Sequence, residues 1–447
     1  MATPKLIVRT VFGIKSKNFH FFNTFWNEIQ KLHLSLRHKR QIQAIMKRIE
    51  RNDYLNKLTS LRDKQIIKII TGVRRCGKST MLEIMQDELR TTGIKEEQII
   101  AINLEDYDNK ELRNPDALYA HVKSRLHKSK MTYLFIDEIQ HVDRFADVLD
   151  ALYIKPNVDM YITGSNAFLL SSEIATLLSG RYVEIKMQPL SFAEFVESTG
   201  NELELGKKYV DYVTNSSFPY TAELRNNPSV ISDYLQGIYN TIVLKDVLQR
   251  KNIRDAMMLE SILTFMLDNI GNTLSTKKIA DTMTSSGRKI DVKTVEKYLS
   301  ALQESFILYR AGRYNVKGKQ LLKTLEKYYL VDVALRRAML GRQGVDVGHL
   351  LENVVYLELL RHNQHVFIGK TGDLEIDFVT INDEQTNYYQ VSASVRNADT
   401  LERELAPLKS IKDHNPKWLL TLDEDPDANY DGIRKVNVLN WLLHRYK

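Results

Sequence analysis

The chain has 447 residues, more than one ordinary hydrophobic core accommodates, so two or three domains are expected. Its composition, 43% hydrophobic and 27% charged, is that of a folded globular protein, and no uncharged apolar run reaches the ~18 residues that span a bilayer. For lack of such a run we expect no membrane partner. The single cysteine, Cys76, excludes an internal disulfide, so we expect a reducing, cytoplasmic setting.

The net charge of +7 comes from an N-terminal tail, residues 1–45. This tail holds eight Lys and Arg residues and one acid, so residues 46–447 are balanced at 55 residues of each sign. A basic, acid-poor start is typical of an organelle transit peptide or a nucleic-acid-binding arm. The alternative, which we prefer, is an upstream extension that is extraneous to the protein, with natural translation beginning at Met46. The clearer amphipathic pattern starts only there and runs to Leu61.

Residues 65–190 alternate between short β-rich apolar runs and helical stretches. This alternation predicts an α/β domain with a parallel sheet covered by helices on both faces, and we place it at residues 46–220. Ligands of such sheets bind at the carboxyl ends of the strands. The five predicted strands are Gln65–Ile70, Ile99–Asn103, Thr132–Ile136, Asp159–Thr163 and Tyr182–Met187.

A complete phosphate-loop (P-loop) pattern, G-x-x-x-x-G-K-[ST], follows the first predicted strand. Its glycines let backbone N–H groups face phosphate oxygens, and the following helix adds the positive end of its dipole. Lys78 is expected to reach the β- and γ-phosphates of ATP, and Ser79 to supply a hydroxyl to Mg²⁺. The predicted nucleotide-binding residues are Gly72, Val73, Arg74, Arg75, Cys76, Gly77, Lys78, Ser79 and Thr80.

Two carboxylates end the third predicted strand, in the run from Tyr133 to Glu138. Downstream of a phosphate loop, such a pair is typical of a Walker-B motif. Asp137 is suited to hold Mg²⁺ from its second shell, and Glu138 is suited to activate the attacking water. We therefore predict ATP hydrolysis with Glu138 as the catalytic carboxylate.

Three further residues bear on the same reaction. Asn166 ends the run Thr163-Gly164-Ser165-Asn166 and is expected to orient the water or sense the γ-phosphate, with a helix cap as the alternative. Arg181 is a candidate arginine finger, in cis or in trans within a homo-oligomer. The alternatives are that Arg181 is a plain surface arginine, or that Arg74 or Arg75 of the loop has this role. Cys76 either makes the loop sensitive to thiol reagents or only fills space, and we prefer the second interpretation.

Together these motifs resemble the AAA+-like ATPases that are widespread in bacteria and archaea, whose second half is an uncharacterised domain. The resemblance rests on the P-loop, the apolar-Asp-Glu strand, Thr-Gly-Ser-Asn, Leu-Ser-Gly-Arg and the run Pro189–Phe195, in that order. It covers about residues 46–440 and implies an AAA+-like ATPase fold. It also supports a natural start near Met46. One departure is Asn215–Pro219, where the family tends to have a Gly-Gly turn.

Residues 221–340 predict a helical linker followed by a winged helix-turn-helix. Leu274–Ala280 and Asp291–Leu299 have the pattern of capped helices, and apolar strands joined by a basic loop follow. In such a module the second helix enters the major groove of DNA. Winged helices also serve as protein-contact domains, so DNA and a protein both stay open as partners. The predicted groove residues are Lys289, Lys293, Thr294 and Lys297.

Residues 341–447 resemble a degenerate restriction-endonuclease-like α/β domain. Glu352 lies on an apolar helix and Asp377 on a strand, where a nuclease of this kind holds its metal ion. The next strand carries Gln390 and Ser392 where active nucleases have Glu-x-Lys. Gln is a poor Mg²⁺ ligand and Ser cannot supply the charge of the lysine, so we expect no cleavage and a surviving binding surface.

The sequence thus predicts an ATP-binding, Mg²⁺-dependent ATPase that acts as a switch or motor on nucleic acid or on a protein partner. Two alternatives stay open: an ATP-gated nuclease, and a regulatory scaffold that binds ATP without hydrolysing it.

Overall fold

The computed structural model describes residues 48–165, 177–200, 203–225, 227–249, 253, 255–341, 346–363, 365–382 and 385–445. The chain divides into two compact units, Met1–Glu50 and Arg51–Lys447, and the second contains all the helices and strands described below. Within the described ranges, no helix has both the length and the apolar character needed to cross a membrane.

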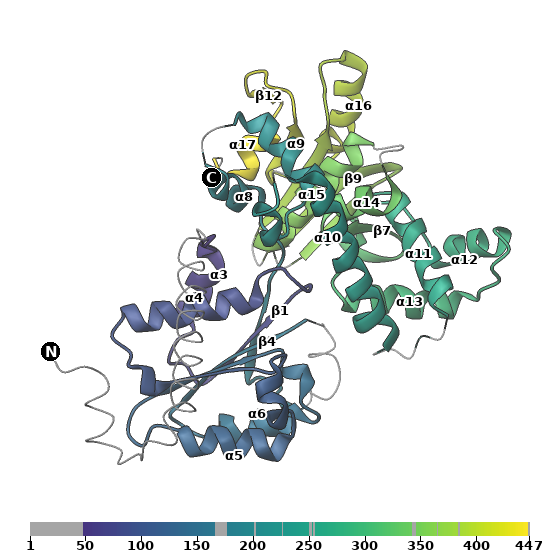
Figure 1. The fold of residues 1–447 in the computed structure, drawn as a ribbon. Helices are drawn as coiled ribbons and strands as arrows, with labels where there is room; N and C mark the ends of the chain where they lie inside the picture. Colours follow the sequence, from purple (N-terminus) through teal and green to yellow (C-terminus); the bar gives the residue numbers. More distant parts are fainter. Residues whose placement is uncertain are drawn as a thin grey trace, which may run out of the picture. The chain divides into compact units, whose positions relative to one another are not determined.

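A five-stranded sheet in which all strands are parallel forms the first part of this second unit (Figure 1). Its strands lie in the order β2-β3-β4-β1-β5. Every strand coincides with a predicted β-rich run, and the predicted α/β fold class is confirmed. The strands are β1 (Ile67–Thr71), β2 (Ile99–Asn103), β3 (Thr132–Asp137), β4 (Val158–Gly164) and β5 (Tyr182–Lys186).

Helices cover both faces of this sheet, with α3 and α4 on one side and α5 and α6 on the other (Figure 1). Strands β1, β3 and β4 are buried along their whole length, as expected for central strands of a covered parallel sheet. The helical elements are α3 (Asn52–Ser60), α4 (Lys78–Thr91), η2 (Glu96–Gln98), η3 (Tyr107–Arg113), α5 (Pro115–Arg125), η4 (Ile139–His141) and α6 (Phe145–Tyr153).

A helical segment follows β5, as the pattern over residues 225–270 indicates. Its first helix, α8, begins with a capping box, in which Ser191 and Glu194 satisfy each other's backbone N–H groups. The elements are α8 (Phe192–Ser198), α9 (Leu205–Asn215), η6 (Pro219–Ala222), α10 (Pro228–Thr241), the π-helix η7 (Ile242–Gln249) and α11 (Ala256–Asp268).

The turn between α9 and η6 is made by Ser216, whose φ of 87° lies in the region that favours glycine. The hydroxyls of Ser216 and Ser217 both donate to Asp332, and the backbone N–H of Ser217 donates to the same carboxylate at 2.6 Å. Sequence analysis named a Gly-Gly turn here only from the resemblance to AAA+-like ATPases. In this chain, hydrogen bonds to a buried carboxylate hold a serine in a conformation that glycine adopts freely.

The remaining strands form one mixed sheet of eight, in the order β12-β13-β11-β10-β9-β8-β6-β7. The two predicted capped helices precede it, with Ser275 and Asp291 as their caps. The elements are α12 (Thr276–Ser285), α13 (Val292–Glu304), β6 (Leu308–Asn315), β7 (Gln320–Leu330), α14 (Val333–Leu340), α15 (Val347–His362), β8 (His365–Thr371), β9 (Leu374–Asn382), β10 (Gln385–Ser392), α16 (Ala398–Lys409), β11 (Lys417–Thr421), β12 (Ala428–Tyr430), β13 (Ile433–Asn437) and α17 (Val438–Leu442).

The β6–β7 hairpin belongs to this sheet. Strand β6 pairs antiparallel with β7 on one side and parallel with β8 on the other, where Arg313 faces Ile368. Sequence analysis placed a domain boundary between residues 340 and 341. Backbone hydrogen bonding runs across that boundary, because the hairpin assigned to the winged-helix module supplies two strands of the terminal sheet.

Candidate functional site

The P-loop lies at the carboxyl end of β1, between that strand and α4. At Gly72 (φ 152°) an added Cβ would stand 2.0 Å from the carbonyl oxygen of Met187, so only glycine fits. Gly77 adopts a left-handed conformation (φ 103°) immediately before α4. Because glycine has no side chain to cap a helix, the first N–H groups of α4 are left for an anion.

Lys78 is buried at the base of this loop. Its Nζ donates to the carbonyl oxygens of Gly72 and Val73, at 3.0 and 3.1 Å, and lies 3.9 Å from Oε1 of Glu138. The backbone carbonyls at the start of the loop therefore bind the ammonium group of Lys78. One cation is held between the start of the loop and the end of β3.

Asp137 and Glu138 lie together at the carboxyl end of β3 and share one partner on β4. The hydroxyl of Thr163 donates to Oδ1 of Asp137 and accepts the backbone N–H of Glu138 at 2.9 Å. Burial raises the pKa of Asp137, although hydrogen bonds from Thr163 and Ser79 oppose the shift. The Asp137 carboxyl is thus poised beside a hydroxyl of the phosphate loop.

Glu138 is held in the ionised form. Burial opposes ionisation, but the charge of Lys78 and a hydrogen bond from Gln140 outweigh it and keep the pKa of Glu138 below its ordinary value. The amide of Gln140 donates both to Glu138 and to the hydroxyl of Ser165, the latter at 3.2 Å. Glu138 also has a φ of 55°, an uncommon backbone conformation for a glutamate. A buried carboxylate with a fixed orientation and a negative charge results.

The other predicted loop residues divide by exposure. Ser79, Thr80 and Arg75 are exposed, whereas Val73 and Cys76 are buried. The side chain of Cys76 faces the backbone, with Sγ 3.4 Å from the carbonyl oxygen of Met187.

Arg74 binds two acids from outside the loop. Its Nε donates to Asp246 of η7 at 2.7 Å, and its Nη1 donates to Glu105, which follows β2, at 3.0 Å. Asp246 is almost fully buried. The phosphate loop is therefore tied by an ion pair to a helix far along the chain.

Comparison with known proteins agrees with this geometry. A family model described as "AAA domain" matches residues 64–196, and one described as "Domain of unknown function (DUF8612)" matches residues 206–346. An uncharacterized protein of Haemophilus influenzae is 37% identical over 399 residues, which are 88% of this chain and 98% of that protein. The chain belongs to the same AAA-domain family.

Two more distant likenesses accompany this relative. An uncharacterized protein of Methanocaldococcus jannaschii is 29% identical to the AAA-domain protein over 370 residues, covering 78% of this chain and 79% of that one. Among solved structures, a Walker-type ATPase of Pyrococcus abyssi is 15% identical, covers 65% of this chain and 95% of its own, and has a TM-score of 0.48. The AAA-domain match, together with the parallel sheet and its P-loop, gives this protein a nucleotide-binding, ATPase-like fold.

Arg181 of the AAA-domain protein lies apart from the P-loop. Its carbonyl accepts the N–H of Ile67, the first residue of β1, and its side chain contacts Asp150 and the ring of Tyr153. The P-loop follows the other end of β1, about 15 Å away for a strand of this length. A finger role in cis does not fit this geometry, and the role in trans stays a prediction. Asn166 lies outside the described residues.

Three residues around the P-loop were not selected from the sequence. Thr163 and Gln140 orient the two Walker-B carboxylates, and Arg51 supports the loop from behind. Arg51 donates to the carbonyl oxygens of Cys76 and Gln188 and pairs with both carboxylate oxygens of Glu194. Thr163 is the first residue of the run that ends at Asn166, and Gln140 follows Glu138 by two positions, so the motifs themselves could have identified both. No local pattern marks Arg51.

The predicted DNA-contacting residues lie on or just before α13. Lys289, Lys293 and Lys297 are exposed. Thr294 has another role, because its N–H and hydroxyl both bind the side chain of the capping residue Asp291. The three lysines stay candidates for phosphate contact, whereas Thr294 is occupied at the start of the helix.

Two of the nuclease-like residues, Glu352 and Asp377, lie near the buried Lys327. Lys327 of β7 donates to Glu352 and to Glu375, at 2.9 Å each. Burial, and then the nearby charge of Glu352, raise the pKa of Asp377 well above its ordinary value. Gln390 donates to Glu404 at 2.8 Å, in place of an acidic metal ligand. Ser392 binds the carbonyl oxygen of Ser394.

Proposed function

We propose that this AAA-domain protein binds ATP with Mg²⁺ and hydrolyses the ATP, with Glu138 activating the attacking water. The observation that carries the proposal is the juxtaposition of Lys78 and Glu138, both buried and 3.9 Å apart at the end of the phosphate loop. Phosphoryl transfer depends mainly on positioning and on charge stabilisation. A fixed cation and a fixed anion at this place supply both.

The loop geometry fits a nucleotide. Gly72 and Gly77 allow a curl that other residues would block, and the start of α4 presents backbone N–H groups to phosphate oxygens. Lys78 would neutralise charge on the β- and γ-phosphates. Its contacts with the loop carbonyls are the interactions that a phosphate would replace.

The donor set beside the loop fits Mg²⁺, which prefers oxygen ligands. Ser79 offers an exposed hydroxyl and Asp137 a carboxylate, and the two already interact. The ion would neutralise phosphate charge that builds up during the reaction. Thr163 would keep Asp137 and Glu138 in a fixed relative orientation.

The role of a switch is supported by the ion pair between Arg74 and Asp246. Arg74 belongs to the phosphate loop and Asp246 to the second half of the chain, so a change in the loop alters a contact of that half. The exposed lysines of α13 make duplex DNA the first partner to test, and a protein is the second candidate.

The decisive experiment measures ATP binding and phosphate release by the full chain. Lys78→Ala should abolish ATP binding, and Glu138→Gln should retain binding but lower turnover by about 100-fold or more, the usual contribution of a general base. Lys95→Ala and Glu111→Gln, at exposed positions, are the matched controls. Wild-type turnover in Glu138→Gln would contradict the assigned role.

The same assay with duplex DNA at two salt concentrations tests the partner. A DNA-dependent increase in turnover that added salt removes would support phosphate contacts by the α13 lysines. Turnover that is indifferent to DNA would favour a protein partner. Tight ATP binding without phosphate release in the wild type would instead favour a non-hydrolysing scaffold.

A further inference from the structure

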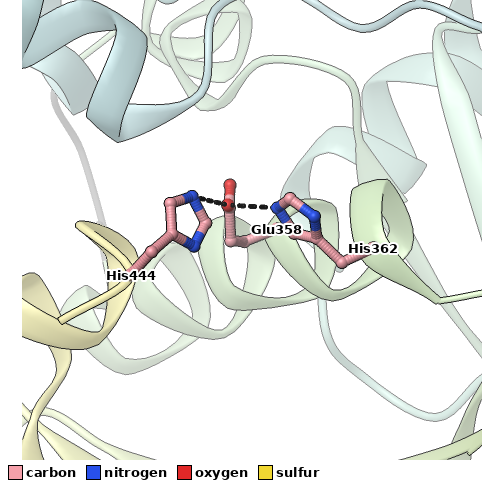
Figure 2. A group of neighbouring side chains, drawn as sticks. All are labelled: Glu358, His362 and His444. Carbon is pink, nitrogen blue, oxygen red and sulfur yellow. Dashed lines mark hydrogen bonds and ion pairs between the residues drawn. The ribbon is translucent and has the colours of Figure 1, made fainter. Parts of the chain in front are cut away.

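Glu358, His362 and His444 form a compact group outside the nucleotide site. Glu358 and His362 lie one turn apart on α15, and His444 comes from the turn that follows α17 (Figure 2). Both imidazole rings approach the same carboxylate oxygen from opposite sides, as Figure 2 shows. One ligand atom of each residue lies within 4.8 Å of the other two.

The separations match those of ligands around one zinc ion. Nε2 of His362 lies 3.0 Å from Oε1 of Glu358, and Nε2 of His444 lies 3.3 Å from the same oxygen. In a tetrahedral zinc site with ordinary Zn–N and Zn–O bonds, neighbouring ligand atoms are about 3.3 Å apart. The two nitrogen–oxygen separations therefore already suit a shared ion, and the ligand atoms of the two histidines lie within 4.8 Å of each other.

The second oxygen of the carboxylate is already oriented by a buried arginine. Nη1 of Arg361 lies 3.2 Å from Oε2 of Glu358, which leaves Oε1 to the two histidines. Nη2 of Arg361 in turn donates to the carbonyl oxygen of Pro189 at 2.7 Å. Carboxylate ligands of metal sites are typically held in this way by an outer shell of hydrogen bonds.

We propose that Glu358, His362 and His444 bind one Zn²⁺ ion, through Oε1 of the glutamate and Nε2 of each histidine. Two imidazoles and one carboxylate are borderline donors that suit Zn²⁺ and disfavour Mg²⁺ and Ca²⁺. Glu358 is 2% exposed, whereas His362 and His444 are 42% and 45% exposed. The ion enters from the solvent side, where water supplies the fourth ligand.

The site joins two segments that are far apart in the sequence. His362 lies in the last turn of α15, and His444 is one residue before the end of the described chain. The bound ion therefore cross-links the C-terminal turn to α15, with a structural role. The proposal does not depend on ATP hydrolysis, because none of the three residues lies in the P-loop or the Walker-B strand.

The test is a Zn²⁺ titration of the full, nucleotide-free chain, freed of metal with a chelator and competed against a chromophoric zinc indicator. His362→Ala and His444→Ala should each weaken binding by at least about tenfold, the loss that even an outer-shell change brings. His414→Ala, at an exposed histidine between α16 and β11, is the matched control and should leave binding unchanged. Equal Zn²⁺ affinity in all four proteins would overturn the proposal.

X-ray absorption on the zinc-loaded wild-type chain keeps the proposal testable if a variant fails to fold. We expect a first shell of nitrogen and oxygen at about 2.0–2.1 Å, with the scattering pattern of two imidazoles. A shell with one imidazole or none would overturn the assignment. If the wild type binds Zn²⁺ no more tightly than His362→Ala does, the proposal is wrong. The three residues are then a hydrogen-bonded group that does not bind zinc.

Discussion

The guanidinium of Arg51 donates a hydrogen bond to the backbone carbonyl of Cys76, 3.0 Å away, in the middle of the phosphate loop. The same side chain binds the carbonyl oxygens of Gln188 and Pro189 and pairs with Glu194. Arg51, which immediately precedes α3, therefore holds the loop through its backbone carbonyl. The carbonyl of Pro189 also accepts from Arg361, so two buried arginines converge on one oxygen.

Replacing Arg51 by alanine should destabilise the protein and weaken ATP binding. The change leaves Glu194 without its guanidinium partner and removes three hydrogen bonds to backbone carbonyl oxygens, those of Cys76, Gln188 and Pro189. Breaking a buried ion pair in this way costs about 3–5 kcal/mol. Urea unfolding and nucleotide titration measure the two effects. Arg90→Ala, which breaks an exposed pair with Glu96, is the control and should cost under about 1 kcal/mol.

Arg74 and Asp246 should behave as one unit in a double-mutant cycle. Arg74→Ala and Asp246→Asn each break the same partly buried contact, so the double variant should lose little more than either single variant. The cycle is read from ATP turnover and from the free energy of unfolding. Additive losses in both measurements would show that the loop and η7 are not coupled through this pair.

Ser216→Gly should be more stable than Ser216→Ala by about 1 kcal/mol. Both variants lose the hydrogen bonds of the hydroxyl to Asp332 and from the N–H of Phe218. Only alanine keeps a side chain at a φ of 87°, and holding a non-glycine residue there is costly. Thermal or urea unfolding of the two proteins gives the difference directly. Equal stability would mean that Ser216 is not strained.

Asp377→Asn should stabilise the protein at neutral pH and have less effect near pH 4. The pKa of Asp377 lies well above 3.8 in the folded chain, because of burial and then of Glu352, so folding strengthens proton binding. The contribution of this group to stability is therefore greatest below pH 3.8 and falls as the pH rises toward the raised value. Asparagine stays neutral and can still accept the N–H of Val391.

Thermal unfolding across this pH range is the measurement, with Asp373→Asn at an exposed position as the control. A loss of stability in Asp377→Asn at pH 7 would indicate that the ionised carboxylate has a partner such as a metal ion. Loss of plasmid cleavage in Asp377→Ala would revive the nuclease alternative.

Cys76 should resist thiol reagents in the folded protein. Its side chain is fully buried, and burial raises the pKa of the thiol, so little reactive thiolate is accessible. Incubation with an aromatic disulfide should leave ATP turnover unchanged and modify the thiol only after unfolding in urea. Rapid modification of the native chain with loss of turnover would favour the thiol-sensitive interpretation instead.

The motifs of the first half could be located from sequence because each depends on neighbouring residues. The local sequence is enough to predict a glycine loop between a strand and a helix. It is also enough to predict carboxylates at the end of an apolar strand. The contact between Arg51 and Glu194 could not be found in this way, because it joins positions 143 residues apart and neither belongs to a recognisable pattern. Arg181 shows that a motif does not fix the distance to the P-loop: its carbonyl accepts the N–H of Ile67 at the opposite end of β1, and its role as a finger in trans stays a prediction.

The second half was less predictable for the same reason. Local periodicity indicated α12, α13 and the strands β6 and β7. It did not predict which strands would pair with each other. The buried acids Glu352 and Asp377 were expected from the pattern. Lys327, which lies between Glu352 and Glu375, comes from a strand that sequence analysis placed in another domain.

The parallel pairing of β6 with β8 also sets the order in which the chain can fold during synthesis. Ile368 follows its partner Arg313 by 55 positions in the sequence, so β6 has an unpaired edge until β8 has left the ribosome. A fragment that ended near residue 340 would keep this edge permanently, and exposed strand edges promote aggregation. In such a fragment α13, which carries Lys293 and Lys297, would pack against a sheet that lacks β8 and the strands beyond it.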